Sequence, residues 1–574
     1  MFISKEIIRK TNWQNFERLI SRLVMAEGFS GARVVGQSND HGADIVASKN
    51  GIRWVFQAKH WNKPVGLSVI DETLRAAQIY NARIPVIVAS GGFEKQALEH
   101  QRALLSQGIP LQLWDTDDLL EHVSRLADGV PNTNKPREYQ EKAIKGIINS
   151  YLNDSNRALA VMATGLGKTF VAAEAMRRVY NIKKNVKILV LAHTNPLVYQ
   201  LERSFWKFLT KNQTTVVWNG YESPSIQELN DAGIVFACIN TVWEYIKKSD
   251  ELPKFDIVIV DECHHAGSQM YKDLFAYTNA GKNGGPFLLG LTATPWRPDE
   301  VDLSDIFGET VVCIDMVEGL KKGFLSNVDY RMYTDNIDWD SLKNLQGKTF
   351  TPKQINRTLF IEQWDDSVVY ELKKTWMEQQ NPRAIVFCGT IEHANIMCSK
   401  LNAMGFCRAA AIYSSSGSGY SMNQFEKNKV LSDFSDGIIN VVCTVDIFNE
   451  GIDVPDVNLL VFQRVTHSRR IFIQQLGRGL RISDNKDKVI VLDFVSDIRR
   501  FAAGIELKDG LEGGSRHATR ISIPNKVTFK KVTGDDPDTE QFLRIWLDDI
   551  AAIEESGENS SVLKFPPVLP NSKK

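Results

Sequence analysis

Short apolar runs rich in β-branched residues alternate with helix-forming segments through the middle of the chain. Between about residues 137 and 315 such runs fall at 187–192, 234–239, 256–260 and 287–291. Between about 316 and 500 they recur at 384–387, 409–412, 438–443, 457–462 and 489–492. Continuous apolar runs separated by helical segments are typical of parallel sheets covered by helices on both faces. The pattern predicts two successive α/β domains, each built on a parallel sheet.

The first 128 residues predict a separate, smaller α/β domain. Asn12 is suited to cap a helix whose apolar residues recur at helical spacing, among them Phe16, Ile20 and Leu23. Strands are expected at 44–48, 52–59 and 84–89, and alternating helix and strand should follow. The polar stretch 128–136 contains two prolines and a glycine, which predicts a linker to the next domain.

The last segment, 501–574, differs from the rest in composition. Apolar residues from Phe542 to Ile553 lie on one side of an acidic amphipathic helix, and the chain then runs into the proline-rich stretch 565–570. We expect a small, mostly helical extension that packs on the preceding domain or contacts a protein partner. The predicted division is therefore 1–128, 137–315, 316–500 and 501–574.

Composition narrows the class of protein only a little. A hydrophobic share of 43% and a charged share of 24% are ordinary for a globular protein. No apolar run approaches the roughly 18 residues needed to span a bilayer, and early charges argue against a signal peptide. The seven cysteines include no CxxC pair, which predicts neither disulfides nor zinc and favours the cytoplasm. A net charge of −1 leaves nucleic-acid binding to local arginines and backbone amides.

The most informative motif is the loop ATGLGKT at 163–169, which follows an apolar strand and precedes a helical segment. Glycines let the backbone wrap a triphosphate, and the start of the helix favours anions. Lys168 should reach the outer phosphates, and the Thr169 hydroxyl should hold Mg²⁺. Met162 stands where the strict pattern has its first glycine. The residues expected to bind ATP here are Thr164, Gly165, Gly167, Lys168 and Thr169.

A second motif, DECHH at 261–265, follows the apolar strand 256–260. Two adjacent carboxylates at the carboxyl end of a strand suit two roles in phosphoryl transfer. Asp261 would hold Mg²⁺, and Glu262 would activate the attacking water. With the phosphate loop, this motif predicts a nucleotide hydrolase.

The order of these motifs resembles that of the superfamily 2 helicases over about residues 137–497. Arg137 and Gln140 are similar to the adenine-reading element, and the TAT segment at 292–294 resembles the element that couples hydrolysis to movement. His264 would connect this element to the ATP site. The segments EGIDVP (450–455) and QQLGRGLR (474–481) resemble the later motifs of that family. The DECH variant is more similar to restriction motors and repair translocases than to DEAD-box proteins.

This resemblance implies two RecA-like domains that close on ATP and move along a nucleic-acid strand. It assigns nucleotide contacts to Gly451, Asp453 and Gln474. It further implies that Arg478 and Arg481 reach across the cleft between the domains and act in catalysis, as an arginine finger does.

The N-terminal domain carries its own polar constellation. In the strand 54–59, Val55, Gln57 and Lys59 fall on one face, so an amide and an amine project from a strand otherwise suited to burial. Asp44 begins the preceding strand, and Glu17 lies on the first long helix.

These residues resemble the Mrr-like branch of the PD-(D/E)xK restriction nucleases over about residues 11–121. The segments that carry the resemblance are FE (16–17), GADI (42–45), QAK (57–59) and SGGF (90–93). By this resemblance Asp44, Glu17 and the Gln57 oxygen hold Mg²⁺ beside the scissile phosphate. Lys59 would orient the attacking water and neutralise developing charge. The alternative is a nuclease-like fold kept for DNA binding.

Together the motifs predict an ATP-dependent DNA translocase or helicase that carries a Mg²⁺-dependent endonuclease and acts on single-stranded or duplex DNA. Restriction of foreign DNA, an antiviral defence, is the expected process. A DNA-repair helicase-nuclease is one alternative. The other is a nucleic-acid-sensing ATPase that signals through a protein partner bound to its extension.

Overall fold

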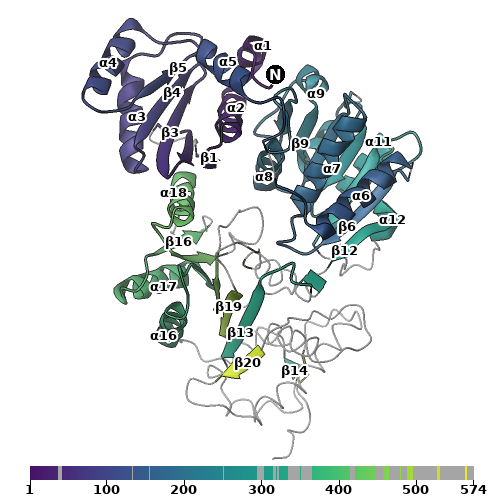
Figure 1. Ribbon diagram of the computed structural model, residues 1–574. Coiled ribbons are helices and arrows are strands. Elements are labelled where there is room, and N and C mark those ends of the chain that lie inside the picture. The colour runs from purple at the N-terminus through teal and green to yellow at the C-terminus, as the bar shows by residue number, and fades with distance from the viewer. Residues whose placement is uncertain are drawn as a thin grey trace, which may run out of the picture.

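The computed structural model describes most of the chain up to residue 293 and shorter segments beyond it. The described residues are 1–35, 42–131, 134–153, 155–249, 251–293, 303–314, 318–319, 322–333, 349–350, 365–413, 421–445, 457–463, 479, 482, 488–494, 527–530 and 563–564. Three sheets of five or more strands follow one another along the chain, and Figure 1 shows each with its own helices. None of the described helices has the length and apolar character needed to cross a membrane.

The N-terminal sheet is mixed, with the strand order β1-β2-β3-β4-β5. Its first three strands pair antiparallel, and β3, β4 and β5 pair parallel. The strands are β1 (Ser30–Val34), β2 (Ile45–Lys49), β3 (Ile52–Lys59), β4 (Ile84–Ala89) and β5 (Gln112–Trp114). The helices are α1 (Lys5–Lys10), α2 (Trp13–Ala26), α3 (Leu67–Ile79), α4 (Lys95–Ser106) and α5 (Thr116–Arg125).

The alternation predicted for β3 is confirmed by the two cores of this domain. Phe56 packs with residues of α2, whereas Val55 packs with residues of α3 on the other face. Asn12 caps α2, because its side chain accepts a hydrogen bond from the Asn15 N–H at 2.8 Å. Gln57 is therefore buried under α3 and not under α2.

The middle sheet is parallel throughout, with the order β12-β6-β11-β10-β7-β9-β8. Its strands are β6 (Arg157–Met162), β7 (Ile188–Ala192), β8 (Thr215–Trp218), β9 (Ile234–Cys238), β10 (Ile257–Val260), β11 (Phe287–Thr292) and β12 (Thr310–Ile314). Its helices are α6 (Glu138–Leu152), α7 (Lys168–Ile182), α8 (Asn195–Trp206), α9 (Ile226–Asp231), α10 (Ile239–Ile246), α11 (Gln269–Thr278) and α12 (Leu303–Phe307). The four predicted strands of this region are present as β7, β9, β10 and β11.

The third sheet is also parallel, with the order β16-β17-β15-β18-β19-β13-β20. Its strands are β13 (Asn327–Tyr333), β15 (Ala384–Phe387), β16 (Ala409–Tyr413), β17 (Val441–Val445), β18 (Leu459–Phe462), β19 (Lys488–Phe494) and β20 (Val527–Lys530). Within the described residues it is accompanied by the helices α16 (Asp365–Trp376), α17 (Ile391–Ala403) and α18 (Gln424–Ser435). All five predicted strands are present, and the predicted α/β class is confirmed.

The C-terminal segment contributes two short strands to the described structure. β20 extends the edge of the third sheet, and β21 (Leu563–Lys564) pairs antiparallel with β14 (Thr349–Phe350). The amphipathic helix expected near residues 542–553 lies outside the described residues. The mostly helical character of the extension and the predicted domain limits stay predictions.

The N-terminal domain docks on the middle domain through α2, which lies beside α8 in Figure 1. Arg18 of α2 donates to Glu202 of α8 at 2.9 Å and also to Glu222, and all three side chains are buried. The Phe2 N–H donates to the carbonyl of Lys211 at 2.7 Å. Buried ion pairs and backbone bonds therefore join these two domains.

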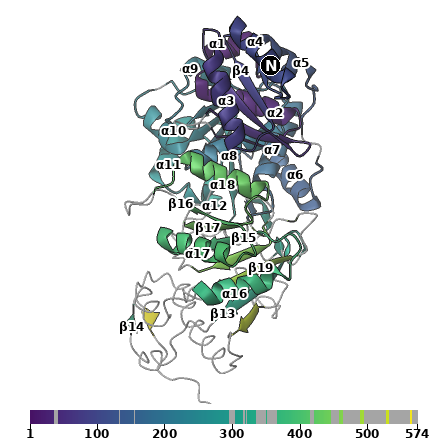
Figure 2. The same cartoon turned by 90° about the vertical axis from the view of Figure 1, so that its left-hand side faces the viewer.

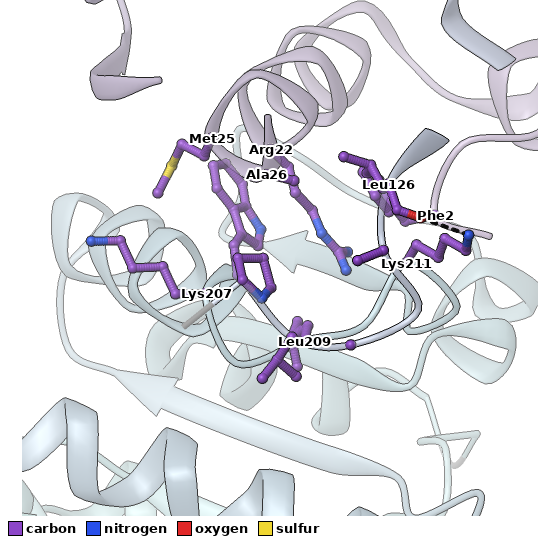
Figure 3. Close-up of a pocket in the computed structure, with 13 residues that line it drawn as sticks. Phe2, Arg22, Met25, Ala26, Leu126, Lys207, Leu209 and Lys211 are labelled. Carbon is purple, nitrogen blue, oxygen red and sulfur yellow. Dashed lines mark hydrogen bonds between the residues drawn. The ribbon is translucent and has the colours of Figure 1, made fainter. Parts of the chain in front are cut away.

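A cavity lies next to this junction, and Figure 3 shows the Arg22 side chain extending from α2 toward the middle domain. The Arg22 guanidinium lies 4.0 Å from the centre of the Phe2 ring and donates to the Thr210 carbonyl at 3.0 Å. Burial lowers the pKa of Arg22 to about 9. The Lys211 ammonium donates to the Leu126 carbonyl at 2.8 Å, the dashed contact in Figure 3.

The N-terminal domain also contacts the third sheet's domain through α18, and Figures 1 and 2 both show this helix beside it. Arg53, near the start of β3, lies 3.5 Å from Asp433 and forms a second ion pair with Asp436. The Tyr80 and Phe425 rings meet edge to face, with their centres 5.7 Å apart. One small domain thus touches both parallel-sheet domains.

Candidate functional site

The phosphate loop lies where the sequence predicts it, between β6 and α7. Met162 is the last residue of β6 and is fully buried, so the strand occupies the position of the missing first glycine. Gly165 and Gly167 have φ angles of 93° and 86°, a region that suits glycine. A Cβ at Gly167 would lie 2.8 Å from the Gln140 amide nitrogen. The backbone conformation therefore favours glycine at 167, and a side chain there would also displace the Gln140 amide.

The start of α6 is tied to this loop. The Gln140 amide donates to the Leu166 carbonyl at 3.0 Å, and its oxygen accepts from the Arg137 N–H at 2.9 Å. The Tyr139 hydroxyl donates to the same Leu166 carbonyl at 3.2 Å. Arg137 and Gln140 are therefore held beside the phosphate loop, as an adenine-reading element would need to be.

The DECH carboxylates face the phosphate loop from the end of β10. The Lys168 ammonium lies 3.3 Å from a Glu262 oxygen. Burial, and then the neighbouring Glu262, raise the pKa of Asp261 to about 7. Burial alone would raise the pKa of Glu262 as well, but Lys168 and then His264 outweigh it and hold that pKa well below its usual range. Glu262 is thus the ionised partner that Lys168 needs.

His264 connects this pair of acids to the next strand. Its Nδ1 lies 3.3 Å from a Glu262 oxygen and 3.2 Å from the Thr292 hydroxyl. Thr292 ends β11, which runs between β6 and β10. The phosphate loop, the acids and Thr292 therefore meet at the carboxyl edge of one parallel sheet, where open α/β sheets bind ligands.

Several predicted residues lie outside the described part of the chain, so their roles stay predictions. They are Gly451, Asp453, Gln474, Arg478 and Arg481. Thr164, Lys168 and Thr169 do lie in the described loop and at the start of α7.

In the N-terminal domain, Asp44 lies against β3. Its carboxylate accepts a hydrogen bond from the Ala58 N–H at 2.6 Å, and the side chain is buried. Lys59 ends the strand, and the SGGF turn lies beside the loop that follows. A Cβ at Gly91 would lie only 2.5 Å from the carbonyl oxygens of Trp61 and Lys63, so this close approach requires glycine.

Gln57 is fully buried, and its amide contacts two neighbouring residues of α3. Its nitrogen lies 3.0 Å from a Glu72 oxygen, and its oxygen contacts the Thr73 hydroxyl. The same Glu72 oxygen lies 3.6 Å from the Lys59 ammonium. Sequence reasoning missed Glu72 and Thr73, because one polar pair on an amphipathic helix carries no signal of its own.

Glu17 is buried on α2, the helix on the face opposite to Gln57. In the described part of the chain, no three His, Cys, Asp or Glu side chains come close enough together to hold a metal. Mg²⁺ is commonly held by one or two carboxylates, with water and substrate phosphate as its other ligands. The oxygens of Asp44 and Glu72 are of the type that Mg²⁺ prefers, so the residues present fit such an ion.

Family models define the class of protein. A restriction endonuclease model of the Mrr type matches residues 8–123. The model of the type III restriction enzyme res subunit matches residues 133–297, and that of the helicase conserved C-terminal domain matches 366–483. The chain thus combines an Mrr-like restriction endonuclease domain with a superfamily 2 helicase motor, as its motifs predicted.

Individual relatives include restriction and DNA-translocating proteins. The endonuclease subunit of the Escherichia coli type I restriction enzyme EcoAI is 25% identical over 555 residues, 86% of this chain and 65% of the relative. The DNA 3'-5' translocase XPB2 of Sulfurisphaera tokodaii is 25% identical over 62% of this chain and 80% of its own length. The chain therefore spans just under two thirds of the EcoAI subunit.

Among solved structures, the ATP-dependent type ISP restriction-modification enzyme LlaBIII bound to DNA has a similar fold. It superposes with a TM-score of 0.52 at 18% identity and covers 96% of this chain and 42% of its own. At this identity the likeness supports the fold alone.

Proposed function

We propose that the protein is an ATP-dependent DNA translocase whose N-terminal domain cleaves foreign DNA in a Mg²⁺-dependent reaction. The observation that carries this proposal is the contact between Lys168 and Glu262, at 3.3 Å. It brings a phosphate-loop cation and a strand-end carboxylate to one edge of a parallel sheet. The same chain carries a nuclease-type strand, β3, in a domain docked on that motor.

For ATP hydrolysis, the described residues would supply most of the site. The loop amides and Lys168 would bind the phosphates, while Thr169 and Asp261 would hold Mg²⁺. The metal would neutralise charge on the phosphates. Glu262, kept ionised by Lys168 and His264, would accept a proton from the attacking water. Arg478 and Arg481 would complete the site when the two parallel-sheet domains close.

For DNA cleavage, Asp44 would hold the metal, with Glu17 and Gln57 as further ligands. The metal would polarise the scissile phosphate and lower the pKa of a bound water. Lys59 would orient that water and neutralise charge in the transition state. We also propose that protein partners bind the C-terminal extension and that the protein acts in the cytoplasm.

Cleavage of plasmid DNA with Mg²⁺, with and without ATP, tests the proposal. The wild type should cleave, Asp44→Ala should hydrolyse ATP without cleaving, and Glu262→Gln should bind ATP without hydrolysing it. Equal cleavage by wild type and Asp44→Ala would refute the nuclease assignment. Near-normal ATP turnover by Arg478→Ala would refute the role of that arginine.

A second experiment separates the translocase from its alternatives. Under ATP, a translocase should displace a third strand from a triplex, whereas a sensing switch would hydrolyse ATP on DNA and displace nothing. A strain lacking the protein should be sensitive to phage or plasmid entry if the process is restriction. Sensitivity to DNA damage alone would favour repair.

A further inference from the structure

Glu72 occupies a position in the nuclease site that nothing in the family pattern assigned. Its side chain is 43% exposed, at the surface end of a network whose inner members, Gln57 and Thr73, are fully buried. It contacts both polar members of the QxK motif, the Gln57 amide at 3.0 Å and the Lys59 ammonium at 3.6 Å. A carboxylate that touches the two motif residues and also reaches solvent is placed to meet a ligand that enters from outside.

The orientation of the Gln57 amide depends on what Glu72 binds. A carboxylate only accepts hydrogen bonds, so an ionised Glu72 requires Gln57 to present its NH₂ group. The Gln57 oxygen then faces the Thr73 hydroxyl, as in this structure. In that orientation the amide oxygen is unavailable to an ion beside Glu72.

Thr73 allows the reverse orientation as well. Its hydroxyl carries a single proton and lies near two acceptors, Gln57 Oε1 and the Val69 carbonyl at 2.7 Å. If the proton goes to Val69, the Thr73 oxygen can accept from the Gln57 NH₂ group. Gln57 then turns its oxygen toward Glu72 with no buried polar group left unsatisfied. Two oxygens facing each other repel unless a cation lies between them.

We infer that Glu72 and the Gln57 oxygen form a divalent-cation site together with Asp44, and that Glu72 supplies the acid that Gln57 lacks. Without a cation, Lys59 and the Gln57 NH₂ group neutralise Glu72. When a cation is bound, the Gln57 amide reverses so that its oxygen faces the cation. Lys59 then no longer pairs with Glu72 and can turn toward the substrate. Gly42 fits this picture, because a Cβ there would lie 3.0 Å from the Glu72 Cβ and 3.2 Å from the Gln57 amide nitrogen. A side chain at that position would crowd Glu72 and Gln57, and the φ of +89° also favours glycine there.

The inference rests on the proposed nuclease function, so its test measures metal binding as well as cleavage. Mn²⁺ is titrated calorimetrically into the full-length protein without nucleotide, using wild type, Asp44→Ala, Glu72→Gln and Glu72→Asp. Glu99→Gln, an exposed α4 glutamate paired only with Lys95, is the matched control. Thermal unfolding checks that each variant is folded.

Glu72→Gln and Asp44→Ala should each weaken Mn²⁺ binding about 10- to 100-fold, with partial recovery in Glu72→Asp and no change in Glu99→Gln. Normal Mn²⁺ binding by Glu72→Gln together with weak binding by Asp44→Ala would overturn the role of Glu72 alone. Normal Mn²⁺ binding by both variants would refute the proposed metal site and, with it, the proposed nuclease function. Cleavage should fall in parallel with Mn²⁺ affinity across the series.

Discussion

Arg18 and Glu202 are 184 residues apart in sequence, yet their side chains form a 2.9 Å ion pair in which both are buried. Arg18 belongs to the endonuclease domain and Glu202 to the motor. Glu222 is a second acid on the same guanidinium, and the two acids raise the pKa of Arg18 despite its burial. Arg18 and its two acidic partners therefore form a buried cluster of charges that spans the two domains.

Removing Arg18 should destabilise this junction strongly. Arg18→Met leaves two buried carboxylates without their cation, a change that costs about 3–5 kcal/mol in comparable buried pairs. The free energy of unfolding, measured by urea denaturation, should fall accordingly. The triple variant Arg18→Met/Glu202→Gln/Glu222→Gln should recover part of the loss. Lys10→Met, which breaks an exposed pair with Glu6, is the control and should change nothing measurable.

Asp261 should make the nucleotide-free protein less stable as pH rises. Its folded-state pKa of about 7 lies above its ordinary value, so the folded state binds the extra proton. The stability contributed is fully present below about pH 4 and is lost as pH rises through about 7. Asp261→Asn cannot ionise and should unfold at a higher temperature than wild type at pH 8, with a smaller difference at pH 5.5.

Thermal unfolding in EDTA measures this difference. Asp117→Asn, a change at a largely exposed carboxylate, controls for the loss of a negative charge. An Asp261→Asn advantage that stayed constant between pH 5.5 and pH 8 would contradict the raised pKa. The same variant should also lose ATP hydrolysis.

Gly167→Ala should impair nucleotide binding. The new Cβ would meet the Gln140 amide at 2.8 Å, on a residue whose φ is +86°. We expect ATP affinity to fall about tenfold or more, measured by binding of a fluorescent ATP analogue. Gly108→Ala has the same kind of positive φ, +83°, but nothing within 4 Å, and should bind normally. Comparable losses in both variants would point to a general folding defect.

The contact with α18 should carry the state of the motor to the nuclease. Arg53 lies near the start of β3, the strand that carries Gln57 and ends at Lys59. Its partners Asp433 and Asp436 belong to the second motor domain. Asp433→Asn/Asp436→Asn leaves the nuclease domain unchanged in sequence. We expect ATP to stimulate DNA cleavage by the wild type, and the double variant should lose about tenfold of this stimulation while its ATPase activity stays near normal.

Cleavage is measured at saturating DNA with and without ATP, with Asp366→Asn on the exposed side of α16 as the control. An unchanged ATP stimulation in the double variant would show that α18 does not couple the two activities. A loss of cleavage even without ATP would place the defect within the nuclease domain.

The strands of the two parallel sheets were predictable because a strand buried on both faces reads as a continuous apolar run, as Ile257–Val260 does. β8 was missed, because this edge strand has only three consecutive apolar residues between polar neighbours. β20 was missed, because its four residues alternate between apolar and polar and form no apolar run.

The residues of the candidate sites also differ in whether the sequence alone could predict them. Lys168, Asp261 and Gln57 belong to contiguous motifs, so their chemistry could be read from the sequence. Glu72 and Arg18 act through partners on other elements, and only the folded chain shows which partners these are. Contacts between domains cannot be predicted from the local pattern of apolar and polar residues.

Arg18 and the Phe2 backbone join the endonuclease domain to the first motor domain through buried ion pairs and a backbone hydrogen bond. If the protein works as proposed, its nuclease would not search DNA independently, because its position on the duplex would be the position of the motor. Cut sites would then mark where translocation halts, at a collision or a roadblock, rather than a sequence read by the nuclease itself. If the break positions were mapped along a DNA that carries a single obstacle, they would show where the motor stalls.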